Sequence, residues 1–420
     1  MAHIPPPLEP FSVAPPFLQR LSSVRTRWIF LAAPALAIFV VGVCRAENSL
    51  GGREDFQLWA DLRRIFTGRV DDGSAAEFPL VRDVASWFFV LMVAGTCVIV
   101  HRQWVLMSDC LSDAAKSGAL KPAKATAFSR LHRMILLPRL LSDASPANYL
   151  PILVQRVNNG MARAGRYVVV VGVAAGILAL LLVVGENKNG LFRVLAPSSL
   201  TGGARSAWVE EAYGSWWASI HEHPFGFISY LCIAGFGIFV ILLQNVVGVA
   251  CTYLIVSLSA VCEIDADWLN RDGLFGWRSV GEVFRTVRWS LALHGAALSV
   301  AVLVLGVDNF PWILVLVAIW VVVVPLFAVM PILTFRAVER AVRERRVKQL
   351  EAELVAQGRA TDVTAIRSYR DEIEYTHSAR IRPLKSKRAS VPALLVLVVL
   401  PVVLTGAQIF FSVRFGSQRP

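Results

Sequence analysis

The chain has 420 residues, of which 55% are hydrophobic and 17% are charged, and its formal net charge is +12. This composition lies far from that of soluble globular domains. No basic stretch alternates with aromatic residues that would stack on bases, so the positive charge does not support nucleic-acid binding.

The 42 basic and 30 acidic residues all lie outside seven apolar stretches. A helix of roughly 20 apolar residues crosses a membrane core about 30 Å thick, so each stretch predicts one spanning helix. The expected fold class is therefore all-α, a polytopic transmembrane helical bundle with seven spans. The stretches are residues 28–44, 84–101, 167–185, 224–262, 289–307, 309–335 and 389–413.

The charges of the loops predict the orientation of the bundle. Lys and Arg outnumber Asp and Glu by 7 in residues 102–166 and by 6 in residues 336–388, whereas residues 45–83 carry −2 and 186–223 carry −1. Basic loops stay in the cytoplasm, where they face anionic lipid headgroups, so the N-terminus is predicted to be cytoplasmic. Arg outnumbers Lys 35 to 7, which is typical of GC-rich bacterial genes. We therefore expect a multi-pass protein of the bacterial inner membrane.

This topology predicts the following order of segments. A cytoplasmic N-terminal segment (1–27) comes first, followed by spans one and two (28–101) with the external loop 45–83 between them, and by a cytoplasmic helical loop (102–166). Spans three and four (167–262) enclose the external loop 186–223, and a cytoplasmic loop (263–288) follows them. Spans five and six (289–335) then lead to a basic cytoplasmic helical hairpin (336–388), span seven (389–413) and an external tail (414–420).

The fourth stretch has 39 uncharged residues, about twice the usual length. It fits either a tight hairpin of two spans that turns at Gln244-Asn245 or one long helix. Two spans would place residues 336–388 outside, so the positive-inside rule favours one helix. Its second half then leaves the hydrocarbon while apolar on every face, and such a helix must be buried in protein. We expect a cytoplasmic helical layer in which 102–166 and 336–388 cover it.

Both covering segments contain helical patterns. Residues 126–142 have apolar and basic residues at the spacing of an amphipathic helix. Residues 336–357 continue the sixth span without a breaker, and Thr361 is expected to cap a second helix that ends near Ala379. Together they predict a charged helical hairpin.

Three tryptophans, Trp208, Trp216 and Trp217, precede the fourth stretch on the external side. Aromatic rings prefer the headgroup zone of a membrane, so they predict an interfacial helix. The other external loop, residues 45–83, has little that would build a core.

The candidate site residues are polar side chains inside the apolar stretches, because hydrocarbon does not satisfy them. They are Gln244, Asn245, His294 and Gln408. For His294 and Gln408 the pattern favours a hydrogen bond between helices. For Gln244-Asn245 the pattern supports two interpretations equally: the two residues line a cavity, or they form a polar bend in the helix.

Three prolines inside the stretches are candidate kinks or gates. Pro325 and Pro331 lie in the sixth stretch and Pro401 lies in the seventh. Each removes one backbone hydrogen bond from a helix, which bends it. They flank the basic hairpin, so a gating link between the two is conceivable.

The sequence offers no support for an enzyme. It contains no motif of a known catalytic class, its six cysteines form no CxxC pair, and the apolar stretches hold no charged residue. We therefore predict no catalytic residue, no cofactor and no metal site.

Two functional hypotheses remain. The first is a signalling, scaffold or interaction component whose cytoplasmic helical layer binds anionic headgroups, a protein partner or a second copy of the chain. Its candidate surface is Arg343, Arg345 and Arg346. The alternative is a channel or facilitator for a small or uncharged solute, built around the buried polar residues. The long fourth helix and the cytoplasmic helix before the last span give a layout that resembles insect chemoreceptor channels, without a shared residue motif.

Overall fold

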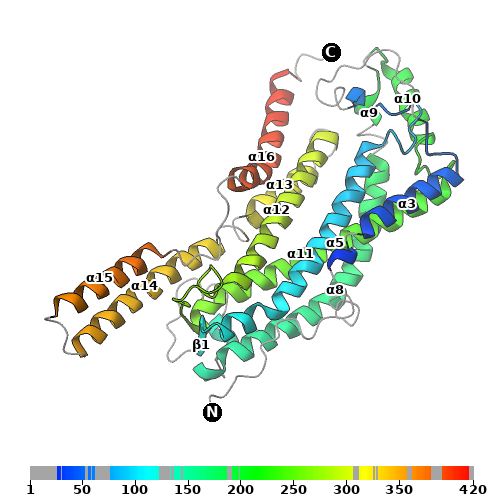
Figure 1. Ribbon diagram of the computed structural model, residues 1–420. Helices are drawn as coiled ribbons and strands as arrows, with labels where there is room; N and C mark the ends of the chain where they lie inside the picture. The colour runs from blue at the N-terminus through cyan, green and yellow to red at the C-terminus, as the bar shows by residue number, and fades with distance from the viewer. Residues whose placement is uncertain are drawn as a thin grey trace.

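The apolar stretches fold into α-helices, and the chain is all-α as its sequence predicted. Within the described residues the strands are one short antiparallel pair, β1 (Leu120–Pro122) and β2 (Cys262–Ile264). Figure 1 shows the computed structural model, in which long helices run side by side. It describes residues 26–29, 31–52, 55–57, 59–61, 76–122, 133, 137–142, 145–186, 192–197, 199–305, 312–324, 327, 330–356, 362–379 and 390–415.

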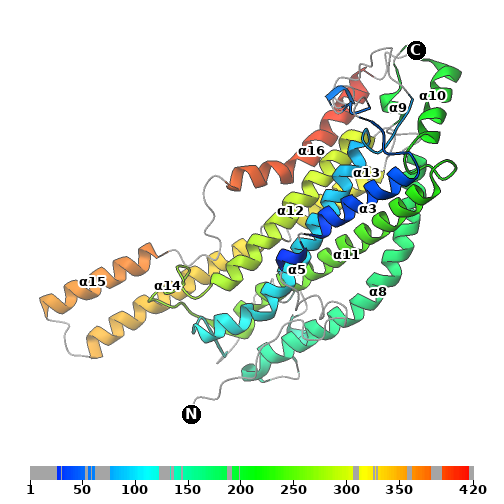
Figure 2. The ribbon, with the colours of Figure 1, turned by 45° about the vertical axis from the view of Figure 1, so that its right-hand side comes forward.

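Four long helices form the body of the molecule: α5 (Val84–Lys116), α8 (Tyr149–Glu186), α11 (Pro224–Val261) and α12 (Arg278–Leu305). α11 packs along α8 and α5, and α12 packs along α5, as Figures 1 and 2 show from two directions. α11 is one helix of 38 residues. The alternative of a turn at Gln244-Asn245 is therefore absent from the structure.

Shorter helices surround this body. They are α2 (Thr26–Ile29), α3 (Ala32–Ala46), α7 (Leu137–Leu140), the 3-10 turn η1 (Pro146–Asn148), α9 (Phe192–Leu195), α10 (Gly202–Gly214), α13 (Trp312–Val324), α14 (Met330–Ala356), α15 (Val363–Ser378) and α16 (Ser390–Phe415). The predicted amphipathic helix at 126–142 falls mostly outside the described residues.

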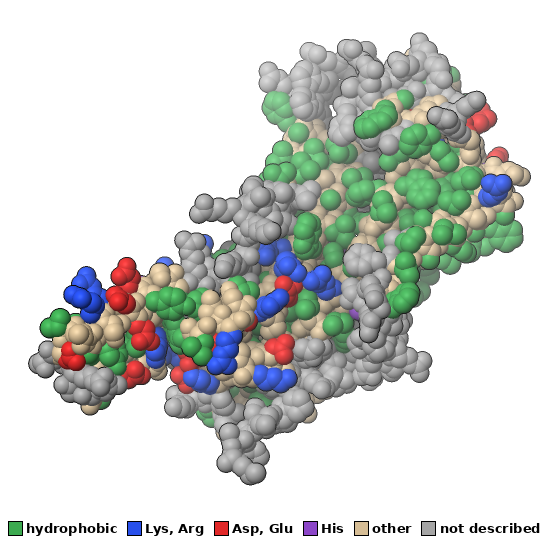
Figure 3. Space-filling view, viewed as in Figure 1, with side chains coloured by type: hydrophobic (Ala, Val, Ile, Leu, Met, Phe, Trp, Pro, Cys, Tyr) green, Lys and Arg blue, Asp and Glu red, His purple; other side chains and the backbone are tan. Residues whose placement is uncertain are grey.

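Three of the described helices are long and apolar enough to cross a membrane, judged by length and composition: Val84–Lys116, Pro224–Val261 and Arg278–Leu303. Shorter apolar helices lie at Pro34–Ala46, Ile313–Val324 and Val399–Phe410. Figure 3 shows that hydrophobic side chains cover one part of the molecule, whereas charged side chains gather on the part that carries the α14–α15 hairpin.

The body helices continue well beyond the apolar stretches. α5 runs on past His101 to Lys116 because Trp104, Met107 and Leu111 keep a buried face at helical spacing. α8 and α12 likewise begin before their apolar stretches, at Tyr149 and Arg278. Charged segments that the sequence assigned to loops are thus largely extensions of the same helices.

The extended helix ends enclose an apolar core. Leu254 in α11 is fully buried and packs in one cluster with Met107 of α5, Leu153 of α8, Val280 of α12 and Val342 of α14. The second half of α11 is therefore buried in protein, as its uniformly apolar sequence predicted. Segments 102–166 and 336–388 both contribute to this core, and the start of α12 completes it.

A second core lies at the opposite end of the body, where α9 and α10 sit in Figure 1. Trp216 and Trp217 follow α10, and each is only 1% exposed. Their rings pack edge-on against Tyr230 of α11, and Phe78 packs against Phe192. The sequence assigned these tryptophans to one interfacial helix, but of the three only Trp208 lies in α10, whereas Trp216 and Trp217 follow it and fill a core to which the loop before α5 contributes.

A buried carboxylate holds this second core together. Asp83 caps α5 by accepting from the backbone N–H and hydroxyl of Ser86. Its Oδ2 also accepts from the indole nitrogens of Trp216, at 2.7 Å, and Trp217, at 2.9 Å. Beside it, the buried Arg82 pairs with Asp61 at 3.1 Å. These contacts tie the loop 45–83 to the segment before α11.

The basic segment near the C-terminus folds into a helical hairpin, as predicted. α14 and α15 lie side by side and project from the body in Figures 1 and 2. The cap of α15 is Asp362 rather than Thr361, and its carboxylate accepts from the N–H groups of Thr364 and Ala365. A carboxylate at this position also favours the positive end of the helix dipole.

Candidate functional site

The predicted polar residue Gln244 lies at the centre of a buried hydrogen-bond network between α5, α11 and α12. Its side chain is 2% exposed. Its Nε2 donates to Gln103 Oε1 at 2.6 Å and to Ser290 Oγ at 3.0 Å. Gln103 in turn donates to the Cys251 sulfur at 3.5 Å. We call the set of Gln103, Gln244, Ser290 and His294 the polar cluster.

The sequence analysis missed Gln103 because it placed residue 103 in a loop. The residue is fully buried on α5. The available signal was the helical spacing of Gln103 with Met107 and Cys110, which are also fully buried. A polar residue on a buried helical face needs a partner, and Gln244 supplies it.

His294 extends the network along α12 through its contacts with Ser290. Its Nδ1 lies 2.8 Å from the carbonyl oxygen of Ser290. A carbonyl only accepts, so Nδ1 carries a proton, and in the neutral ring Nε2 is then an acceptor. His294 Nε2 and Gln244 Oε1 are both buried, and neither has a hydrogen-bond partner in the part of the chain that the structure describes.

A cavity of about 20 Å³ lies between α11, α12 and α13. Its lining includes Gln244, Asn245, His294, Trp320 and Phe327. This volume admits about one water molecule. Two unpaired acceptors among the lining residues suit a single small hydrogen-bond donor.

Of the other two predicted polar residues, Asn245 lines the same cavity as Gln244 and His294, whereas Gln408 lies elsewhere, on α16. Asn245 is exposed, and its Nδ2 donates to the carbonyl of Ile241 within α11. Gln408 donates to the Val302 carbonyl at 2.8 Å and joins α16 to α12. Of the four residues predicted as one membrane-buried site, Gln244, Asn245 and His294 therefore line one cavity and Gln408 does not.

The three prolines also differ in their surroundings. Pro325 lies outside the described residues. Pro331 is the second residue of α14 as described, and residues 328–329 directly before that helix lie outside the described residues, so its predicted kink stays a prediction. Pro401 lies inside α16, and its carbonyl accepts from the Thr405 hydroxyl at 2.8 Å. Figures 1 and 2 show α16 changing direction along its length.

The three hairpin arginines make contacts within the chain. Arg343 pairs with the buried Glu339 at 2.7 Å and donates to the Ala379 carbonyl. Arg346 pairs with Glu372 of α15 at 2.6 Å. These two residues therefore fasten α15 to α14.

Arg345 fastens the hairpin to the body. Its guanidinium binds the Glu263 carboxylate and the Ile264 carbonyl, both at 2.9 Å. The arginines predicted as an open surface for lipid or a partner are thus occupied at the base of the hairpin. The end of the hairpin away from these contacts is the hairpin tip, which we define by the exposed apolar residues Val355, Val363 and Ile366.

The described residues contain no group of three His, Cys, Asp or Glu side chains that could hold a metal ion. Neither the protein-family models nor the curated proteins nor the solved structures include a match to this chain.

Proposed function

We propose that this chain is a multi-pass protein of the bacterial inner membrane, with seven spans and a cytoplasmic N-terminus. It acts as a signalling, scaffold or interaction component that binds a protein partner through the hairpin tip. The observation that carries the proposal is the projecting hairpin itself, whose outer end is uncovered while its base is fastened (Figures 1 and 2).

The contacts at the base support this function because they fix the direction of the hairpin. Arg345 links it to β2, and Arg343 and Arg346 link its two helices. A surface held in one orientation loses little freedom on binding, which favours affinity.

The chemistry of the tip suits a protein partner. Val355 and Val363 are 69% and 70% exposed. Exposed acidic residues alternate with the exposed basic residues of the same two helices, so the charged surface is mixed, which suits a protein partner as well as anionic headgroups. The acidic residues are Glu351, Glu353, Asp371, Glu372 and Glu374. Apolar anchors with a charged rim are the usual composition of a protein interface.

The experiment is photo-crosslinking in the native host from an unnatural amino acid at position 363. We expect a discrete protein adduct, to a partner or to a second copy, that mass spectrometry identifies. The matched control is position 322 on α13, where Val322 is also 69% exposed but lies in an apolar helix. Adducts to lipid alone, or none from position 363, would contradict the proposal.

A second candidate function is a channel or facilitator for a small or uncharged solute. The polar cluster favours it, because two buried acceptors lie without partners among the residues of a cavity. Replacing Gln244 and Asn245 with leucine should then block solute flux while crosslinking from position 363 persists. Unchanged flux in this double variant would exclude the polar cluster as a pathway.

A further inference from the structure

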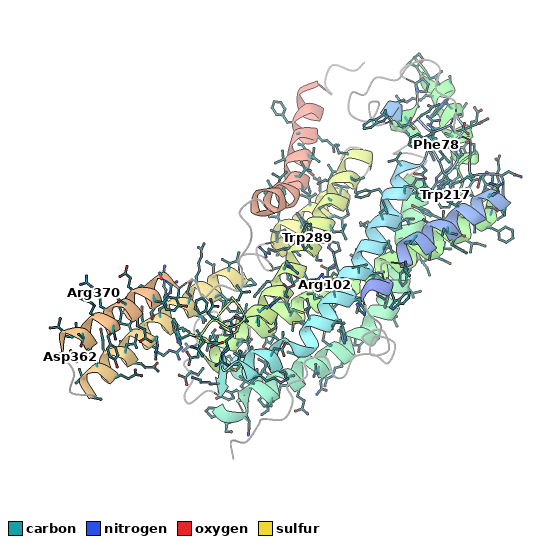
Figure 4. The ribbon with its side chains drawn as sticks, in the orientation of Figure 1. Phe78, Arg102, Trp217, Trp289, Asp362 and Arg370 are labelled. Carbon is teal, nitrogen blue, oxygen red and sulfur yellow. The ribbon has the colours of Figure 1, made fainter. Side chains whose placement is uncertain are left out.

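The ends of two apolar stretches meet at one level of the body. Arg102 follows the second stretch on α5, and Trp289 begins the fifth stretch on α12. Figure 4 shows both residues where α5 and α12 run side by side. Arg102 reaches α12 directly, because its Nη2 lies 3.3 Å from Glu282 Oε2.

Positive charge exceeds negative charge at this place. Arg285 pairs with the same oxygen of Glu282 that Arg102 uses. Arg288 lies three residues beyond Arg285, on a neighbouring part of the same helix face. Arg102 and Arg285 therefore share one carboxylate, and Arg288 adds a further positive charge beside Arg285. We call these three residues the boundary arginines.

Arg288 carries the strongest indication of a missing partner. Its Nε is buried, and no hydrogen-bond partner for it exists among the described residues. A buried guanidinium nitrogen without an acceptor costs free energy, which an anionic oxygen would recover. The nearby carboxylate of Glu282 is already shared by Arg102 and Arg285, and the described part of the chain offers Arg288 Nε no acceptor.

The surroundings of the boundary arginines indicate where that oxygen comes from. Trp289 is 56% exposed beside them, and an exposed indole next to arginines is typical of a membrane–water interface. The side chains of Arg102 and Arg285 are about half exposed, at 48% and 50%. Figure 3 shows charged side chains directly adjoining the hydrophobic surface over this part of the body.

We infer that the boundary arginines and Trp289 form a binding site for the phosphate of an anionic phospholipid. The guanidinium groups of Arg285 and Arg288 hold the phosphate, and the Trp289 ring lies along the glycerol and upper acyl chain. The inference rests on the membrane location proposed above but is independent of the partner at the hairpin tip.

The test uses the full chain in nanodiscs that contain phosphatidylcholine and phosphatidylglycerol. Native mass spectrometry then measures which lipid the released protein retains. We expect the wild-type chain to retain phosphatidylglycerol preferentially. Arg288→Gln should lower the preference for phosphatidylglycerol several-fold, since each basic group near a membrane contributes about 1 kcal/mol. The double variant Arg285→Gln with Arg288→Gln should lower it on the order of tenfold. Arg288→Lys keeps the charge and should retain most of the preference.

The control removes two arginines elsewhere. Arg367 and Arg370 are exposed on α15, and Figure 4 shows Arg370 far from Trp289. Their double glutamine variant should leave the preference unchanged, and an equal loss in this control would overturn the proposal. So would a wild-type chain without lipid preference, or one stabilised equally by inorganic phosphate in lipid-free detergent.

Arg288→Gln removes a side chain whose Nε has no partner among the described residues, so the variant should insert and fold normally. Membrane insertion is measured separately, by the yield of monodisperse protein in detergent. A failure here leaves the crosslinking result from position 363 unaffected, so this inference and the proposed function are tested independently.

Discussion

The side-chain amide of Gln244 donates to the side-chain oxygen of Gln103 at 2.6 Å, and this bond joins α11 to α5 inside the body. Each glutamine is at most 2% exposed. Because the bond lies where water does not compete, losing one partner leaves the other unsatisfied. The pair therefore fixes how the two helices are aligned along each other.

We expect Gln103→Leu and Gln244→Leu each to lower the free energy of unfolding by about 1–3 kcal/mol, since each leaves a buried polar group unpaired. The double variant should cost less than the sum, with a coupling energy of about 0.6 kcal/mol and at most about 2. Thermal unfolding in detergent measures all four proteins. Strict additivity would show that the two side chains do not interact.

The buried half of α11 gives a sharper prediction. Leu254 is fully buried, so Leu254→Asp places an unpaired charge in the core, at a cost of about 3–5 kcal/mol. Expression level and melting temperature in detergent should both fall. The matched control is Val355→Asp at the exposed hairpin tip, which should stay within about 0.5 kcal/mol of wild type. Equal melting of the two variants would show that this part of α11 is not packed.

Asp272 predicts a pH dependence in the loop before α12. Burial by itself would raise the pKa of Asp272, but the backbone N–H groups of Gly276, Leu274 and Arg278 outweigh it and lower the pKa. A carboxyl whose pKa is lower in the folded state stabilises the fold above its unfolded pKa of about 3.9. That contribution is lost as the pH falls through the folded pKa.

Asp272→Asn should therefore be less stable than wild type at pH 7 by about 1 kcal/mol, because both carboxylate oxygens accept from backbone N–H groups and asparagine has only one acceptor oxygen. The difference should shrink at acid pH, because only the wild-type chain loses a charge there. Denaturant unfolding of both proteins from neutral to acid pH measures this. A stability difference between the two proteins that stays constant from neutral to acid pH would show that the ionised carboxylate of Asp272 does not stabilise the fold.

The apolar pattern of the sequence predicted the helices but not their ends. The second apolar stretch was predicted to end at His101, before the first charge, whereas α5 continues through Arg102 because its buried face repeats beyond it. A charged residue on the exposed face is compatible with a helix, so charge alone does not mark a helix end. The same error hid Gln103, the partner of Gln244.

The local pattern of apolar and charged residues did not predict contacts between segments that are distant in the sequence. Arg82 and Asp61 form a buried pair in a loop that had seemed unable to build a core. Trp216 was assigned to an interface because an exposed and a buried tryptophan look alike in one sequence. The buried position of Trp216 depends on Asp83, which lies 133 residues earlier in the chain and accepts a hydrogen bond from the Trp216 indole N–H.

Asp83 provides the last prediction. Its Oδ2 accepts from both tryptophans and from the Ser86 hydroxyl, and its Oδ1 accepts from the Ser86 N–H. An asparagine has one acceptor oxygen, so Asp83→Asn must point its NH₂ group at a donor. We expect a loss of about 1–3 kcal/mol, the cost of a buried unsatisfied group. A change in tryptophan fluorescence should accompany it, because Trp216 and Trp217 lose their acceptor.

The matched control is Asp362→Asn at the exposed cap of α15, where asparagine caps as well as aspartate and the stability should barely change. If both variants unfold like wild type, Asp83 does not hold the aromatic core together.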